Sequence, residues 1–372
     1  MLFSNIFVEA DSVLSKEKNT YFMAISAETG FLFDVSNMSN LFQHKNAGKE
    51  AINESYYHGY SLKIDINSKK HKEYASLYRF SKYGLGFYFG YFNNRNIGYP
   101  LAVFGWTEIP IRYLKSKHKF SFGYGAEFGI AWNFNIYNEI TNPTNIFLGS
   151  KENYILGAYI YADYHITNYL FLGIGAGFRH FSNGGWKQPN IGINIFTTSL
   201  SLKGRLNSSF LEQSERLQLP KYTPQWKWGG KIAFGKKQNG LNTPHYYKIL
   251  AGFTLLRQFS YKHSVGAGVE TTFSIGTMDD GRSRVKWKDI ASPSVIGCWE
   301  WILSSKFVVP MDIGVYLLPK NIANGEKYQT YARIGVRYYL SPRFWAGLTV
   351  KGHSTVIHTA ADFSELGIGF SN

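Results

Sequence analysis

The feature that most constrains the fold is a long stretch, residues 119–137, in which apolar residues alternate with small or polar ones. A period of two indicates a β-strand, because successive side chains of a strand point to opposite faces of the sheet. Strands of soluble sandwiches are usually about 5–6 residues long. A strand of well over a dozen residues with one aromatic face therefore predicts a wall with lipid on its outer side. The apolar positions are Phe120, Phe122, Tyr124, Ala126, Phe128, Ile130, Trp132, Phe134 and Ile136.

The same alternation recurs along the chain, for example at residues 265–270 and 344–351, and it ends the chain at Leu366, Ile368 and Phe370. Short turns alternate with long polar loops, which is the asymmetry expected of an outer-membrane barrel. We therefore expect an all-β fold, an antiparallel transmembrane β-barrel of roughly 12–16 strands. The expected short turns are residues 167–168, 261–263, 304–305 and 341–343, and the expected long loops are residues 137–153, 276–289 and 319–328.

The domain organisation is predicted to be simple, because no linker or shift in composition divides the sequence. A single outer-membrane barrel domain over residues 1–372 is expected, with residues 1–18 as a short lead-in. Two connections, residues 67–83 and 207–225, are longer than this scheme predicts for the short-turn side, and we interpret them as small periplasmic elements. Residues 1–16 have neither the basic nor the apolar segment of a signal peptide, so if the protein is exported, that peptide is not in this sequence.

Composition excludes several other classes of protein. Aromatic residues make up 17% of the chain and charged residues only 17%, which excludes intrinsic disorder. The single cysteine, Cys298, excludes a disulfide scaffold. The net charge of +15 indicates an acidic partner. Because the basic residues are scattered through turns without a nucleic-acid motif, phosphate-bearing lipid is favoured over nucleic acid.

One predicted strand ends in side chains that can do chemistry. From Leu170 to Phe178 the even positions are apolar and face lipid, and the next two residues of the same parity are His180 and Ser182. The following strand carries Asn194 on its outward face. A hydroxyl becomes a nucleophile when a base takes its proton, and the base needs a third group to fix its tautomer. These residues can fill the three roles; the alternative is that they are interfacial polar residues at the end of a lipid-facing stripe.

The loop after the serine can supply a further element of such a site. Gly184 and Gly185 allow the backbone to turn tightly and to present N–H groups to a developing oxyanion. The backbone of Asn183 precedes them directly.

The segment from His180 to Ile193 resembles a known signature. It matches, without a gap, all ten specified positions of His-x-Ser-Asn-x-Gly-x-Lys-Gln-Pro-Asn-x-Gly-Ile, the motif of the outer-membrane lipid A 3-O-deacylases, the PagL family. The resemblance covers only about residues 170–205, and members of that family are typically much shorter chains. It implies an active site on the outer wall of the barrel, facing the outer leaflet, with no metal. It implies the following roles: Ser182 as nucleophile, His180 as general base, and the backbone of Asn183, Gly184 and Gly185 as oxyanion hole. By their own chemistry, the basic and amide side chains nearby are expected to bind the phosphorylated substrate: Lys187, Gln188 and Asn190.

The third member of the triad departs from that family, which has a glutamate where this chain has Asn194. The outer-membrane phospholipase A family also shows His-x-Ser-Asn-Gly, and its asparagine follows the histidine at the spacing that separates His180 from Asn194. An asparagine can orient an imidazole but cannot stabilise the imidazolium by charge. Glu152, at the head of the preceding strand, is an alternative carboxylate.

The expected function is therefore that of a serine esterase in the outer membrane of a Gram-negative bacterium, removing an ester-linked acyl chain from lipid A of lipopolysaccharide. No cofactor is expected. The alternatives are a phospholipase A and a catalytically inactive pore or transporter barrel. Asp279 and Asp280 could bind calcium for a phospholipase, but a solvated acidic turn is the favoured interpretation of this pair. The expected partner is lipid A in the membrane and not nucleic acid, and pairing of two copies as a homodimer is left open.

Overall fold

A computed structural model describes ten ranges of the chain. Within them the chain forms sixteen antiparallel strands and one short helix, α2 (Lys72–Leu77). No helix in this part of the chain is long and apolar enough to cross a membrane. The described ranges are residues 20–32, 56–67, 72–79, 81–111, 119–206, 218–238, 240–275, 290–318, 329–355 and 358–372.

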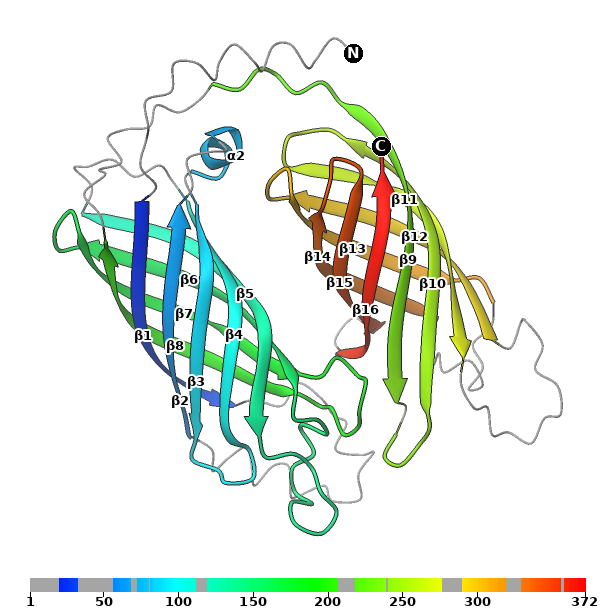
Figure 1. The fold of residues 1–372 in the computed structure, drawn as a ribbon, viewed down its shortest axis with the longest axis horizontal. Coiled ribbons are helices and arrows are strands. Elements are labelled where there is room, and N and C mark those ends of the chain that lie inside the picture. Colours follow the sequence, from blue (N-terminus) through cyan, green and yellow to red (C-terminus); the bar gives the residue numbers. More distant parts are fainter. Residues whose placement is uncertain are drawn as a thin grey trace.

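The sixteen strands close into two barrels of eight strands each (Figure 1). The N-terminal barrel consists of β1 (Thr20–Leu32), β2 (Tyr56–Asn67), β3 (Lys82–Phe92), β4 (Gly98–Pro110), β5 (Phe120–Phe134), β6 (Asn153–His165), β7 (Leu170–Ser182) and β8 (Ile193–Arg205). The C-terminal barrel consists of β9 (Gln225–Gln238), β10 (His245–Gln258), β11 (His263–Ile275), β12 (Ala291–Ile302), β13 (Phe307–Tyr316), β14 (Thr330–Tyr339), β15 (Phe344–Thr355) and β16 (His358–Ser371).

This arrangement confirms the all-β antiparallel barrel fold and corrects the expectation of one continuous barrel over residues 1–372. Strand β1 pairs with β8, with Phe22 opposite Arg205, and so seals the first barrel. Strand β16 pairs with β9, with Ser371 opposite Gly229, and seals the second. The two edge strands of each sheet therefore pair with each other, so neither sheet has an open edge. The connection between β8 and β9 links two separately closed barrels.

The outward and inward faces follow the predicted parity. On β7, Leu172 and Ile174 are exposed on the outer wall, whereas Phe171 and Arg179 are buried inside. The prediction fails at the end of β5, where Phe134 points inward and is buried. The preceding residue, Asn133, has φ 68°, and this left-handed conformation shifts the register of the two faces.

Ion pairs fill the interior of both barrels. In the first, Lys63 pairs with Glu127 at 2.7 Å, and Lys203 bridges two further carboxylates. In the second, Arg333 contacts Glu270 at 2.8 Å and two more carboxylates. An eight-stranded barrel is just wide enough for its own side chains, so charges that face inward must pair with one another.

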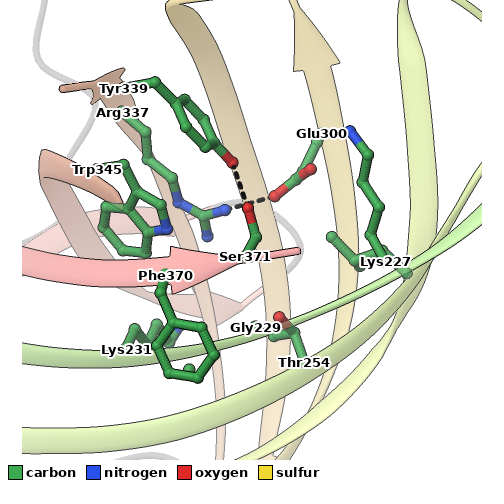
Figure 2. Close-up of a pocket in the computed structure, with 12 residues that line it drawn as sticks. Lys227, Gly229, Lys231, Thr254, Glu300, Arg337, Tyr339, Trp345, Phe370 and Ser371 are labelled. Atoms are coloured by element: carbon green, nitrogen blue, oxygen red, sulfur yellow. Dashed lines mark hydrogen bonds and ion pairs between the residues drawn. The ribbon is translucent and has the colours of Figure 1, made fainter. Parts of the chain in front are cut away.

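A small cavity of about 20 Å³, room for about one water molecule, remains inside the C-terminal barrel. It lies near the ends of β12 and β14, and the guanidinium of Arg337 pairs there with the carboxylate of Glu300 (Figure 2). Trp345 covers one side of it.

The two ends of the barrels differ. Turns at residues 166–169, 259–262, 303–306 and 340–343 lie at one end, the short-turn end, together with α2 and the C-terminus (Figure 1). The connection 135–152 and the segment 183–192 lie at the opposite end, the loop end. Of the long loops expected from sequence, residues 276–289 and 319–328 fall outside the described residues.

The barrels touch each other at both ends. At the short-turn end, the Tyr78 hydroxyl donates a hydrogen bond to the carbonyl of Ile302, and the Tyr78 ring packs against Trp301. At the loop end, the segment after β7 meets Gln238 at the end of β9 and Ser364 in the middle of β16.

Candidate active site

The alternation of β7 and β8 places three polar side chains on the outer wall of the N-terminal barrel. His180 and Ser182 have outward parity at the end of β7, and Asn194 has outward parity at the start of β8. In the β7–β8 ladder, His180 lies directly opposite Asn194. The strands thus bring together residues that are separated by fourteen positions in the chain.

Hydrogen bonds join these three side chains into a relay. Nδ1 of His180 lies 2.8 Å from Oδ1 of Asn194, and Nε2 lies 2.8 Å from Oγ of Ser182. An amide oxygen can only accept, so Nδ1 carries the proton and Nε2 is free to accept from the serine hydroxyl. This is the tautomer that a general base needs.

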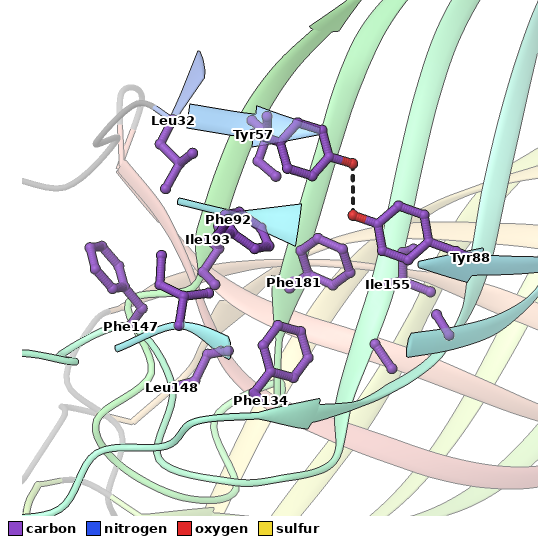
Figure 3. Close-up of a cluster of buried hydrophobic side chains, with 14 of the residues drawn as sticks. Leu32, Tyr57, Tyr88, Phe92, Phe134, Phe147, Leu148, Ile155, Phe181 and Ile193 are labelled. Carbon is purple, nitrogen blue, oxygen red and sulfur yellow. Dashed lines mark hydrogen bonds between the residues drawn. The ribbon is translucent and has the colours of Figure 1, made fainter. Parts of the chain in front are cut away.

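The inward residues between them anchor the relay. Phe181, Ile193 and Ile195 point into the barrel and are at most 1% exposed. They belong to a buried apolar cluster that fills the loop end of the barrel, in which Phe181 contacts Phe134 at 5.4 Å and Tyr88 at 5.8 Å between ring centroids (Figure 3). Close packing on one face of each strand fixes the side chains on the other face.

The loop after Ser182 is held by its own polar groups. The N–H of Asn183 donates to Oδ1 of Asn190 at 2.9 Å, and the N–H of Gly185 donates to Oδ1 of Asn183 at 2.9 Å. The Asn183 amide also donates to the carbonyl of Lys187. Two of the three predicted oxyanion donors are therefore already engaged within the loop.

Gly184 is the exception. Its N–H makes no hydrogen bond to any residue in the described ranges, and its φ of 68° is left-handed. Gly185 follows with φ 90°. Successive left-handed residues turn the backbone sharply, which glycine does without strain. Of the predicted donors, the Gly184 N–H is the one available to an oxyanion.

The three residues predicted to bind substrate are placed differently from one another. Lys187 is exposed to the surroundings of the barrel. The Gln188 side chain donates to the carbonyl of Gln238 in the C-terminal barrel, and the Asn190 side chain holds the N–H of Asn183. Of the three, Lys187 alone is charged, and its side chain is exposed.

The alternative third residue, Glu152, is exposed, and the position at Nδ1 of His180 is occupied by Asn194.

Ser182 itself is only 6% exposed. Tyr154, its partner in the β6–β7 ladder, packs edge-on against Trp186 beside it.

Sequence reasoning missed the contribution of the second barrel to this site. Gln238 and Ser364 approach the loop after Ser182, although they lie far from the motif in the chain. The pairing of strands within each barrel could not reveal this contact, because it lies between outer walls. The motif itself gave no signal for it.

Among the described residues, no group of three or more His, Cys, Asp or Glu side chains is arranged to hold a metal ion. The Asp279–Asp280 pair lies outside those residues.

Comparisons with known proteins agree with the division into two barrels. Residues 58–203, within the N-terminal barrel, match the family described as lipid A 3-O-deacylase (PagL). Residues 226–372, within the C-terminal barrel, match the family described as acyloxyacyl hydrolase, C-terminal domain. No significant match was found among curated protein sequences.

Solved structures with some similarity are outer-membrane proteins. The OccK11 (OpdR) protein of Pseudomonas aeruginosa is 9% identical, with 95% of each chain covered and a TM-score of 0.23. Omp33 of Acinetobacter baumannii is 9% identical, with 95% of this chain and 97% of that chain covered and a TM-score of 0.16. These scores are low, so the fold rests on the strand pairing of this chain itself.

Proposed function

Because the chain belongs to the lipid A 3-O-deacylase (PagL) family, we propose that it is a serine esterase of the outer membrane that hydrolyses an ester-linked acyl chain of lipid A. The observation that carries this proposal is the relay of 2.8 Å contacts from Asn194 through His180 to Ser182. A hydroxyl, a base and an orienting group in hydrogen-bonding sequence are what acyl transfer by a serine requires.

The proposed reaction has two halves. Nε2 of His180 takes the hydroxyl proton as Oγ of Ser182 attacks the ester carbonyl, and the Gly184 N–H stabilises the oxyanion. As the ester C–O bond breaks, His180 gives the proton to the departing alkoxide oxygen, which leaves the acyl chain on the serine. A water molecule then gives a proton to His180 and attacks the acyl carbon. His180 returns that proton to the departing Oγ of Ser182, which releases the fatty acid and restores the serine.

Asn194 would orient the imidazole through its Oδ1 during both halves. It carries no charge, so it would favour the imidazolium less than a carboxylate does. The proposed enzyme therefore depends on geometry at this position and gains little from electrostatic attraction.

The position of the relay suits a lipid substrate. His180 and Ser182 continue the lipid-facing stripe of β7 at the loop end of the barrel. In outer-membrane barrels the longer loops are extracellular and the short turns periplasmic. We infer that the relay faces the outer leaflet, where lipid A resides, and that exposed Lys187 meets its phosphate groups.

The direct test is mass spectrometry of lipid A and phospholipids from Gram-negative cells that express the wild-type chain or the Ser182→Ala variant. Loss of one acyl chain from lipid A with the wild type only would support the proposal. Unchanged lipid pools, with both proteins correctly folded in the outer membrane, would overturn it.

One observation favours a second candidate, a phospholipase A. The triad ends in an asparagine, a feature that this chain shares with outer-membrane phospholipase A, and the structure engages that asparagine with His180. The same experiment separates the two activities, because a phospholipase would accumulate lysophospholipids. A pore is less well supported, since ion pairs occupy both barrel interiors.

A further inference from the structure

The segment that follows the proposed nucleophile is bonded to the second barrel as well as to its own. Gln238, the last residue of β9, accepts a hydrogen bond from the N–H of Gln188 on its Oε1 at 2.8 Å. Its carbonyl accepts from the Gln188 amide at 3.2 Å, and its own N–H donates to the carbonyl of Gly185 at 3.2 Å. Three hydrogen bonds thus hold the loop from Gly185 to Gln188 to one residue of the C-terminal barrel.

Gln238 is itself held in place. Its side-chain amide donates to the carbonyl of Thr243, across the connection to β10, and the residue is 8% exposed. Its Oε1 is therefore a fixed acceptor, oriented by one neighbour and directed at the Gln188 N–H.

A second residue of the C-terminal barrel lies against the glycine of the proposed oxyanion hole. A Cβ placed on Gly184 would lie 2.0 Å from Oγ of Ser364 on β16, and 3.1 Å from the ring of Tyr154. The backbone of Gly184 is thus enclosed between β6 of one barrel and β16 of the other. Both contacts to the second barrel fall on the few residues that carry the oxyanion donor.

We propose that the C-terminal barrel is part of the catalytic apparatus, with Gln238 as a positioning residue that holds the loop and thereby aims the Gly184 N–H at the oxyanion. The inference rests on the proposed function and goes beyond it, because it assigns a role in the reaction to a barrel that carries none of the triad. A displaced oxyanion donor weakens transition-state binding far more than substrate binding. The effect should therefore appear in kcat.

The experiment compares Gln238→Ala with Gln238→Glu in the purified full-length protein, using lipopolysaccharide in detergent micelles as substrate. Gln238→Ala removes the acceptor for the Gln188 N–H and should lower kcat by about tenfold to a hundredfold with little change in KM. Gln238→Glu keeps an acceptor oxygen for the Gln188 N–H but loses the donor to the Thr243 carbonyl, so its kcat should lie between those of Gln238→Ala and the wild type.

A matched control is Glu139→Ala, which removes another contact between the barrels at the same end, the hydrogen bond from Asn242 to Glu139. It should leave kcat unchanged. Far-UV circular dichroism, and the difference in gel migration between unheated and heated samples, report whether each variant is folded. If folded Gln238→Ala keeps the wild-type kcat, or loses no more than Glu139→Ala, the positioning role is overturned.

The two proposals fail in different ways. If the Ser182→Ala variant hydrolysed substrate at the wild-type rate, the proposed function would be overturned. A dead Ser182→Ala beside a fully active Gln238→Ala would overturn only the role of the second barrel. A fall in folded yield with an unchanged kcat for the folded fraction would show a purely structural role for Gln238 and would likewise overturn the inference.

Discussion

His180 and Asn194 face each other across the β7–β8 ladder, with Nδ1 of the histidine 2.8 Å from the amide oxygen of the asparagine. Asn194→Ala should lower kcat by about a hundredfold, because the imidazole loses the group that fixes its tautomer. Asn194→Asp should match or exceed the wild type, since a carboxylate accepts the same hydrogen bond and also stabilises the imidazolium. Initial rates of fatty-acid release check both. Equal activity of the alanine variant and the wild type would remove Asn194 from the relay.

Gly184→Ala should inactivate the protein without unfolding it. The residue has φ 68°, and its new methyl group would collide with Oγ of Ser364. We expect a fall in kcat of about a hundredfold, comparable to the loss of one oxyanion donor. Gly204→Ala is the matched control, because a Cβ there meets nothing within 4 Å. Similar rates for both variants would contradict the enclosure of Gly184.

Phe181→Ala should lower the free energy of unfolding by about 3–5 kcal/mol, the usual cost of a cavity at a buried aromatic residue. Phe181 is fully buried in the cluster that fills the loop end of the barrel. Ile174→Ala, on the exposed outer wall of the same strand, should cost much less. Urea unfolding in lipid vesicles, followed by tryptophan fluorescence, measures the difference. An equal loss for the two variants would show that the cluster does not anchor the strand.

Arg179→Met should destabilise the N-terminal barrel by about 3–5 kcal/mol, because it takes the guanidinium away from two buried carboxylates, Glu28 and Glu127, and leaves Glu127 with Lys63 alone. The Arg179 guanidinium contacts Glu28 at 2.9 Å and Glu127 at 3.1 Å inside the barrel. Arg343→Met, at an exposed turn, removes the same charge without that cost. The same unfolding assay applies, and near-equal midpoints would contradict the importance of the interior pairs.

Lys187→Ala should raise KM for lipopolysaccharide while leaving kcat nearly unchanged, since an exposed cation that meets the substrate phosphates contributes to binding in both the ground and transition states. The effect should shrink at high salt, which screens exposed charges. Lys151→Ala, another exposed lysine on the same end, is the control. A fall in kcat at constant KM would instead assign Lys187 to the reaction itself.

The sequence predicts the features that depend on one strand at a time, which are the positions of the strands and the face to which each side chain points. The period of two identified the strands and their faces, so the outward positions of His180, Ser182 and Asn194 followed from parity alone. Parity failed only where the backbone left the extended region, as at Asn133 before Phe134. A single positive φ is not visible in a pattern of apolar residues.

The closure into two barrels could not be read from the same pattern. Each strand alternates in the same way whether its sheet closes after eight strands or after sixteen, and the choice depends on whether β8 pairs with β1 or continues the sheet. For a related reason, the sequence could not predict that the N–H groups of Asn183 and Gly185 donate hydrogen bonds within the loop. They depend on side-chain contacts within a loop, for which the sequence sets no period.

The double closure also bears on how the chain reaches its native state. Among the described strands, no hydrogen-bonded ladder joins one barrel to the other, and each seam brings together strands from within one half of the sequence. Folding slows as contacts become more distant along the chain, so two seams of moderate span form faster than one that joins β1 to β16. The first barrel can be sealed before any strand of the second has paired. Folding of this chain therefore never requires a sheet of more than eight strands with unpaired edges in the membrane.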